Sequence, residues 1–247
     1  MKGASARLPV ALALLAAISV DGVAARAIPC APPLDQPLTL NLTQHLWRAD
    51  GKPIRATVTR TLRFGHDRDG FSVTAYIAAI ETDQADPRAR QRLLLGYGAP
   101  GDVPIVVRLD PAMTIVGIES LDARWTDFRR RQAALAVAMA AEGAGERASA
   151  LGPMLDAMGP SERVGLLSAF LAPVLRHCGT AAPEGATTVP DGMIRIEILA
   201  DSGPMRDVSR YGVDPATGLL RVLDRSLISA AAPLRPLSEH WTLDPQN

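Results

Sequence analysis

A cysteine and a histidine, the residues of a thiol-enzyme dyad, are adjacent at Cys178 and His177 in the apolar stretch 166–179. Such a dyad needs the base within hydrogen-bonding reach of the thiol. The stretch has helical periodicity, and neighbouring residues on a helix point about 100° apart. We therefore expect Cys178 on an apolar face, His177 at the edge of that face, and no dyad. The apolar face comprises Val164, Leu167, Leu171, Val174 and Leu175.

A second candidate nucleophile is Ser202, in the stretch Asp201-Ser202-Gly203-Pro204. Together with His177-Cys178 it resembles the base and nucleophile motifs of the chymotrypsin-like serine proteases, Ala-His-Cys and Gly-Asp-Ser-Gly-Gly-Pro. The resemblance covers six residues, and only 24 residues separate His177 from Ser202, where that family has a whole barrel. Ala200 also stands in place of a motif glycine. We interpret residues 201–204 as a β-turn.

Residues 96–101, Gly-Tyr-Gly-Ala-Pro-Gly, match the letters of the dinucleotide-binding pattern GxGxxG. That pattern works where a strand ends and a helix begins, so that the helix N-terminus meets a pyrophosphate. Here a helical pattern precedes the glycines, and Pro100 and Pro104 disfavour a helix after them. We interpret the segment as a loop and expect no cofactor.

The histidines do not show the short spacings of metal ligands. His45 and His240 are the pair that a sheet could bring together, while His66 and His177 stand alone. Asp67 and Asp69 resemble a fragment of a calcium loop, without its central glycine or its distal glutamate. We therefore predict no metal site.

The N-terminus has the three parts of a secretory signal peptide: basic residues, an apolar run over residues 8–20, and small residues before a cleavage site. The apolar run is shorter than the roughly 18 to 20 residues of a membrane-spanning helix, and no later segment reaches that length. We predict a signal peptide over residues 1–27 and one exported domain over residues 28–247. The protein would then be periplasmic or extracellular, without a membrane span.

The cysteines are Cys30 and Cys178, and both follow the predicted cleavage site. An oxidising compartment favours their pairing. We predict a Cys30–Cys178 disulfide that attaches the mature N-terminus to the helical middle of the chain. The alternatives are a free buried thiol and a reactive cysteine.

Charge and composition exclude several classes of partner. Without residues 1–27 the chain has 23 basic and 25 acidic residues, which offers no general attraction to nucleic acid. Aromatic residues make up 4% of the sequence, which argues against glycan processing and single-stranded nucleic-acid binding.

Alternating apolar and polar residues predict strands in both terminal parts of the chain. The alternation begins with Leu38, Leu40 and Leu42, which face away from Thr39, Asn41 and Thr43. The predicted strands lie near residues 38–47, 54–64, 71–80, 105–109, 114–119, 193–200, 206–213, 219–228 and 239–243.

Helical periodicity is found between these strands. A short helix is expected after Asp86-Pro87, and an amphipathic helix over residues 122–141. A Gly-rich break with room for a short helix follows, and a second long helix begins at Pro160 and extends to Cys178. Arg129, Arg130 and Arg131 are expected on the solvated face of the first long helix.

This order of elements predicts an α+β fold, in which an antiparallel sheet from the N- and C-terminal segments packs against two main amphipathic helices. A curved sheet roofed by helices can enclose a cavity, as in lipoprotein-carrier proteins, with which the chain shares no motif. We expect an exported, non-catalytic binding or envelope-associated protein whose partner is an apolar small molecule or lipid, or an envelope protein. The alternatives are an adaptor that uses the arginine-bearing helix and a hydrolase built from distant residues, with Ser202, His240 and Asp201 as candidates.

Overall fold

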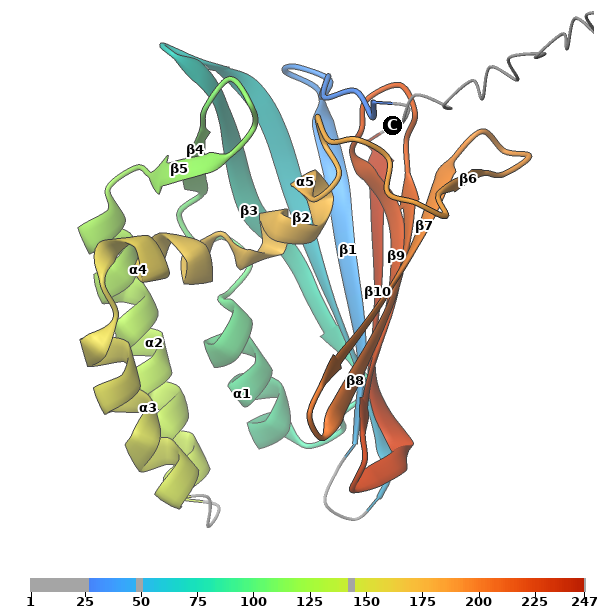
Figure 1. Cartoon of the computed structure of the whole chain (residues 1–247). Coiled ribbons are helices and arrows are strands. Elements are labelled where there is room, and N and C mark those ends of the chain that lie inside the picture. Colours follow the sequence, from blue (N-terminus) through green and yellow to red (C-terminus); the bar gives the residue numbers. More distant parts are fainter. Residues whose placement is uncertain (1–26, 48–50, 142–144, 247) are drawn as a thin grey trace, which may run out of the picture.

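One antiparallel sheet and a layer of helices over one of its faces make up the structure (Figure 1). The computed structural model describes residues 27–47, 51–141 and 145–246, so the predicted signal peptide lies outside the described residues except for Ala27. Within them the sheet has ten strands, which confirms the predicted α+β class. The strands are β1 (Pro37–Trp47), β2 (Pro53–Asp67), β3 (Gly70–Thr82), β4 (Ile105–Leu109), β5 (Ile115–Ile118), β6 (Thr187–Thr188), β7 (Ile194–Ser202), β8 (Met205–Val213), β9 (Leu220–Ser229) and β10 (Ala232–Pro245).

Two meanders form the sheet, and the two ends of the chain join them. The strand order is β5-β4-β3-β2-β1-β10-β9-β8-β7-β6. At the centre, β1 pairs with β10 from Leu38 opposite Pro245 to His45 opposite Ser238. The predicted combination of N- and C-terminal segments in one sheet is therefore confirmed.

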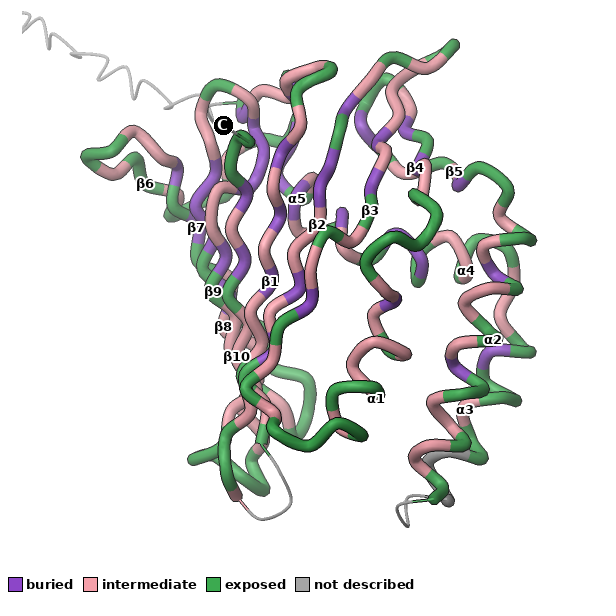
Figure 2. Tube along the Cα trace, turned by 180° about the vertical axis from the view of Figure 1, so that it is seen from behind, coloured by how far each residue is buried: buried purple, intermediate pink, exposed green. Residues whose placement is uncertain are grey.

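The two faces of the sheet differ as the alternation predicts. Leu38, Leu40 and Leu42 of β1 are buried on the face that the helices cover. On the other face, Asn41 accepts a hydrogen bond from Thr59 (2.9 Å) and donates one to Thr242 (3.4 Å). Figure 2 shows from behind how buried and exposed positions alternate along the strands. The hydrophobic core thus lies between the sheet and the helices.

The C-terminal strand is longer than the predicted strand 239–243. β10 begins at Ala232, although Pro233 and Pro236 lack the N–H group that a ladder needs. Its pairing with β9 is irregular between Ala232 and Leu237, as expected where prolines interrupt the ladder. The two-residue strand β6 was not predicted either, because it is too short to show alternation.

The helices are α1 (Pro87–Tyr97), α2 (Leu121–Ala140), α3 (Gly145–Ala157), α4 (Pro160–Leu167), the 3₁₀ turn η1 (Ala169–Leu171) and α5 (Ala172–Leu175). The predicted starts of α1 and α4 are correct. Asp86 caps α1 by accepting from the Arg88 N–H (3.0 Å), and Glu162 accepts from the Gly159 N–H (2.7 Å) at the start of α4. No helix within the described residues is long and apolar enough to cross a bilayer.

The second long helix, predicted from Pro160 to Cys178, is in fact three short segments. The Ser168 hydroxyl donates to the Val164 carbonyl (2.7 Å) and competes with the backbone ladder. Pro173 cannot donate to a preceding turn, so the chain continues as η1 and α5. The predicted apolar face survives these breaks, since Leu167, Leu171 and Val174 are all buried. The second long helix is α3, in the segment predicted as a break.

The predicted disulfide Cys30–Cys178 is present, with a Cα–Cα distance of 4.7 Å. Backbone hydrogen bonds flank it, from Ile28 to Thr180 (2.8 Å) and from Gly179 to Pro29 (3.2 Å). Gly218, in the turn between β8 and β9, allows that turn to approach Pro29 closely, because a Cβ at this position would lie 1.7 Å from the Pro29 carbonyl oxygen. The start of the described chain is thereby fixed to the end of the helical layer.

His177 was predicted at the edge of the apolar face. In the structure it is buried, with 8% of its surface exposed. Its ring packs edge-on against Tyr211 of β8, at 4.8 Å between centroids, which sequence alone could not place there. Its Nε2 atom has no hydrogen-bond partner within the described residues. Burial, and then the charge of Arg176, lower the pKa of His177 from 6.5 to about 4.

The disulfide should account for a large part of the stability. We expect Cys30→Ala/Cys178→Ala to lower the free energy of unfolding by about 2–5 kcal/mol, because the bond closes a long loop in the unfolded chain. Urea unfolding of the wild-type protein with the disulfide intact, and again after its reduction by dithiothreitol, measures this difference. The double variant serves as the control, since the reductant should not change its stability. Equal stability of the oxidised and reduced wild type would contradict the expectation.

His177 should make stability depend on pH. Between pH 6.5 and pH 4 the unfolded chain binds a proton at His177 that the folded protein excludes, so the folded state loses about 2–3 kcal/mol as the pH falls. His177→Phe keeps a ring against Tyr211 and should reduce this decline, as measured by urea unfolding at pH 7, 5.5 and 4.

The matched control is His66→Phe, at an exposed histidine whose ring also stacks on an aromatic residue, Phe71. This variant should keep the wild-type pH profile. A decline as steep in His177→Phe as in the wild type would show that another group causes it.

Candidate functional site

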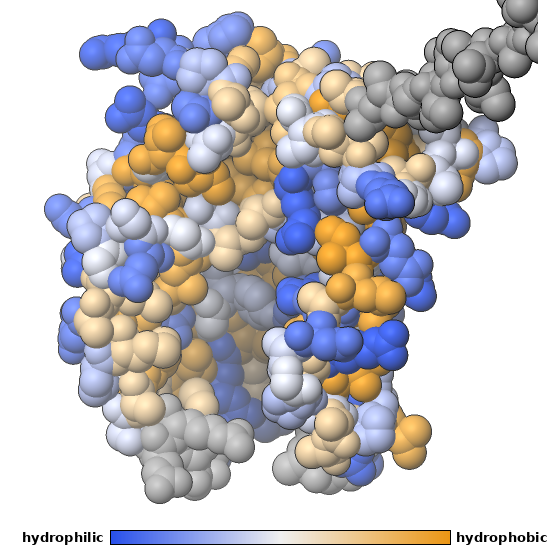
Figure 3. Space-filling view, in the orientation of Figure 1, coloured by the Kyte–Doolittle hydropathy of each residue, from blue (hydrophilic) through white to orange (hydrophobic). Residues whose placement is uncertain are grey.

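A cleft of about 1000 Å³ lies between the sheet and the helices. The two layers meet where α5 lies on β9 and α4 lies on β5. Elsewhere α2 and α3 pack on each other, and a hollow remains between the helical layer and the strands. Figure 3 shows this hollow opening between the two layers. Its volume is at the upper end of the range for small-molecule pockets, about 300–1000 Å³.

Apolar side chains form much of the wall of the cleft. The sheet contributes inward-facing positions of β1, β3, β4, β9 and β10, namely Leu42, Ala75, Ile77, Ile105, Leu223 and Trp241. The helical layer contributes Phe128, Leu151, Met154, Leu155, Leu166 and Phe170. Met154 and Leu166 are exposed within this wall (52% and 39%), so they are apolar surface without a protein partner to cover it.

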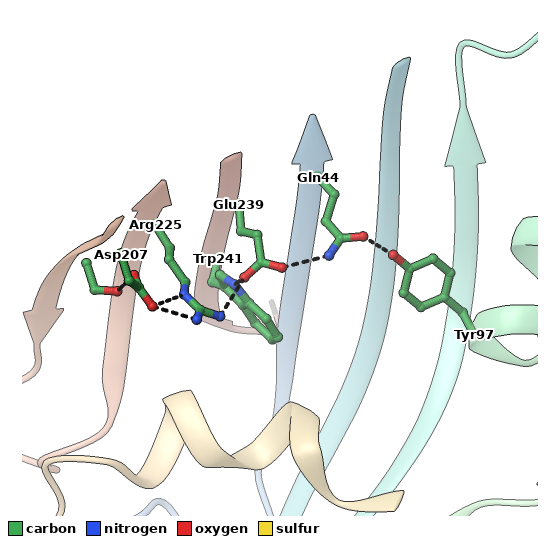
Figure 4. Close-up of polar contacts among 7 residues, drawn as sticks. Gln44, Tyr97, Asp207, Arg225, Glu239 and Trp241 are labelled. Carbon is green, nitrogen blue, oxygen red and sulfur yellow. Dashed lines mark hydrogen bonds and ion pairs between the residues drawn. The ribbon is translucent and has the colours of Figure 1, made fainter. Parts of the chain in front are cut away.

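A row of polar side chains crosses the sheet side of the cleft (Figure 4). Ser209 of β8, Arg225 of β9, Glu239 of β10 and Gln44 of β1 are opposite one another in register. All four line the cleft, and Tyr97 at the end of α1 reaches the row from the helical layer. The antiparallel register therefore builds one polar line from four strands.

Hydrogen bonds and ion pairs run along the whole row. Asp207 accepts from the Arg225 guanidinium at 2.6 and 3.0 Å, and the Arg225 Nη1 atom lies 3.7 Å from Glu239. Glu239 in turn accepts from the Gln44 amide at 2.7 Å, and the Tyr97 hydroxyl donates to the Gln44 Oε1 atom. The members of the row thus satisfy one another.

The charges in the row shift several pKa values. The hydrogen bonds from Arg225 lower the pKa of Asp207, and Asp207 raises that of Arg225. Burial, and then the charge of Glu239, raise the pKa of the Tyr97 hydroxyl. Asp207 therefore serves as an anionic acceptor. The row is thus suited to forming a rigid polar part of the cleft wall rather than to supplying a general base.

Of the three arginines predicted on the solvated face of α2, Arg129 and Arg130 are exposed and Arg131 is half-buried. Arg124, Arg130 and Arg131 line the cleft, and Arg131 pairs with Asp102 at 3.7 Å. Arg129 instead pairs with Asp156 of α3, at 2.5 Å. Arg131 differs from the prediction because α2 turns one side toward a hollow, where long basic side chains can lie without filling a packed core.

The segment predicted as a loop, residues 96–101, begins in the last turn of α1, which ends at Tyr97, and the predicted loop is confirmed for residues 98–101. It follows the end of α1, where Gly98 has a positive φ of 104°. Several of its residues line the cleft, and the Ala99 N–H donates to Asp102 at 2.9 Å. The loop therefore shapes one rim of the hollow.

The hydrolase candidates are not brought together. Asp201 and Ser202 end β7 at the turn into β8, which confirms the predicted turn. His240 lies on β10, with β8 and β9 between, and its Nδ1 atom is 2.7 Å from Asp224. Strand spacing of about 4.8 Å puts β7 and β10 roughly 14 Å apart. Ser202 and His240 therefore cannot act on one substrate atom.

The histidines form no metal cluster in the described parts of the chain, where no group of three or more His, Cys, Asp or Glu side chains could hold an ion. His45 and His240 lie on paired strands but are offset, because His45 is opposite Ser238 and His240 is opposite Thr43. His66 stacks on Phe71.

No protein-family model matches the chain, and no curated protein matches it. Among solved structures, it is aligned with a protein of Nitrosomonas europaea provisionally assigned as AttH, at 9% sequence identity and a TM-score of 0.19. The alignment covers 84% of this chain and 49% of the other, so the chain spans about half the length of that protein. A TM-score this low supports no argument about fold or function, so the cleft is interpreted from its own residues.

Proposed function

We propose that the chain is an exported, non-catalytic binding protein that holds an apolar small molecule or lipid in the cleft between the sheet and the helices. The observation that carries this proposal is the cleft of about 1000 Å³ with apolar side chains from both layers. A volume of this size between two layers is unusual, because protein interiors are otherwise packed to crystal density.

The exposed apolar surface inside the cleft supplies the driving force for binding. Each Å² of apolar surface removed from water contributes about 25 cal/mol. Met154 and Leu166 are large side chains that gain from being covered, and Phe128 and Phe170 line the same space. An apolar ligand would complete the packing that the protein leaves open.

The disulfide supports an oxidising location for this protein. Disulfides persist in secreted and periplasmic proteins and are rare in reducing compartments. Cys30 lies shortly after the predicted signal peptide, residues 1–27, and its bond to Cys178 stabilises the N-terminus that cleavage would create. The predicted signal peptide and the disulfide point to the same periplasmic or extracellular location.

The competing hypotheses gain less from the site. A hydrolase loses its candidate residues, because Ser202 and His240 lie on strands separated by two others. The arginine-mediated adaptor would be expected to have a filled core, whereas Arg124 and Arg131 line an open cleft. The cleft likewise favours a small molecule or lipid over an envelope protein as the partner.

Filling the cleft should abolish binding of a neutral apolar probe. Ala172 is exposed and lines the cleft, so Ala172→Trp places an indole in it without displacing a buried side chain. We expect this variant to bind N-phenyl-1-naphthylamine at least about tenfold more weakly than the wild type, as measured by probe fluorescence. Ala133→Trp, at an exposed position of α2 that does not line the cleft, is the matched control and should bind like the wild type.

Native mass spectrometry of protein exported to the bacterial periplasm complements this measurement. A retained small molecule would appear as added mass that organic solvent removes. A bare polypeptide mass in repeated preparations, together with unchanged probe fluorescence in the wild type, would refute the proposed function.

A further inference from the structure

The charges that line the cleft do not balance. Six arginines and four carboxylates face it, although the whole chain has equal numbers of basic and acidic residues. Each of the four carboxylates already has an arginine partner. Asp207 and Glu239 pair with Arg225, and the other pairs are Asp102 with Arg131 and Asp127 with Arg130.

Arg60 is the cleft arginine whose charge is in the least favourable environment. It projects from β2, where its neighbours in register are Leu40 of β1 and Ile77 of β3. Its guanidinium carbon lies 5.2 Å from the centre of the Phe170 ring, and no carboxylate within the described residues pairs with it. Arg60 is therefore a cation between aliphatic and aromatic groups.

Arg60 keeps its charge in this environment. Burial lowers the pKa of its guanidinium to about 10, so the group is still protonated at neutral pH. A largely buried charge without an opposite charge is unfavourable and is uncommon unless a partner compensates for it. The ring of Phe170 offers a cation–π contact, which offsets a small part of this cost.

A second arginine of the same cleft has a donor without an acceptor. The Nε atom of Arg124 is buried and has no hydrogen-bond partner in the described parts of the chain. Arg124 projects from α2, in the helical layer, whereas Arg60 projects from the sheet. Arg60 and Arg124 therefore line one cleft from opposite layers, and neither pairs with a carboxylate in the described residues.

We propose that Arg60 binds the acidic headgroup of an amphiphile whose apolar part occupies the cleft, so that the ligand is an acyl or alkyl chain with a carboxylate or a phosphate. This inference rests on the proposed function and deepens it. The net charge of the cleft suits a ligand with one or two negative charges, and the aliphatic neighbours of Arg60 suit a chain that begins directly at the headgroup.

Four ligands with the same sixteen-carbon chain test this proposal: hexadecanoate, hexadecyl phosphate, hexadecanol and hexadecyltrimethylammonium. Each ligand is added as a competitor of N-phenyl-1-naphthylamine bound to solvent-stripped wild-type protein at neutral pH. The ligand concentrations stay below the critical micelle concentration or, for hexadecanol, below the solubility limit. We expect at least one of the two anions to bind about 10- to 100-fold more tightly than hexadecanol, since a hydrogen bond to a charged group has that strength. The tighter of the two identifies the headgroup, and the cation should bind most weakly.

Arg60→Met should remove this discrimination. The variant keeps a side chain of similar length without the charge, so its affinity for the anions should fall by about 10- to 100-fold while that for hexadecanol stays the same. Arg60→Lys, which retains a positive charge, should keep a preference for the anions. The matched control is Arg55→Met, at an exposed arginine on the same strand but outside the cleft, which should bind all four ligands like the wild type.

Two further results separate the failure of this inference from the failure of the proposed function. Equal binding of anions and hexadecanol by the wild type, or an anion preference that persists in a folded Arg60→Met, would overturn the role of Arg60 and leave an apolar ligand in place. Failure of all four ligands and of the neutral probe to bind would overturn both. Arg60→Met should have a melting temperature at or above that of the ligand-free wild type, because it removes an uncompensated charge.

Discussion

The pairing of β1 with β10 is the interaction on which the rest of the structure depends. Without it the chain would form two meanders, each with an exposed edge strand open to aggregation. The pairing joins residues about 200 positions apart, as the hydrogen bond between Asn41 and Thr242 illustrates. It also builds the polar row, since Gln44 and Glu239 face each other across this seam. The sheet and its cleft can therefore form only after both ends of the chain are present, and such non-local pairing is slow.

The helical layer is shaped by its breaks as much as by its helices. Ser168 and Pro173 interrupt the stretch after α4, so that α4 lies on β5 at one side of the sheet and α5 on β9 at the other. An unbroken helix would be straight and could not follow the curved sheet in this way. The turn between them carries Phe170 over Arg60, and the disulfide at Cys178 fixes the far end.

Alternation and capping signals were sufficient to predict most of the fold. The positions of Leu38, Leu40 and Leu42 gave the buried face of β1, and Asp86 marked the start of α1. The failures have physical causes. The sequence pattern missed the first half of β10 because of its prolines, and it missed most of α3 because of its glycines. At both places the local propensity opposes the secondary structure that the tertiary fold imposes.

The candidate site was harder to predict than the fold. Gln44 continues the inward alternation of the β1 leucines, so a polar residue facing the helices could have been recognised. Its partners Arg225 and Glu239 required the strand order and register, which no local pattern contains. Arg129, Arg130 and Arg131 were assigned to solvent because a charge run on a helix is usually exposed, and only the open cleft explains why Arg131 is half-buried and pairs with Asp102.

The hollow between the layers has a consequence for the lifetime of the protein. A cleft of about 1000 Å³ means that the empty protein forgoes contacts that a close-packed interior would supply. A molecule that fills the cleft binds the folded state alone, so it shifts the folding equilibrium in proportion to its concentration. Proteases remove the unfolded form continuously. If the proposed ligand occupies the cleft, the abundance of this protein follows the supply of that ligand, without any change in gene expression.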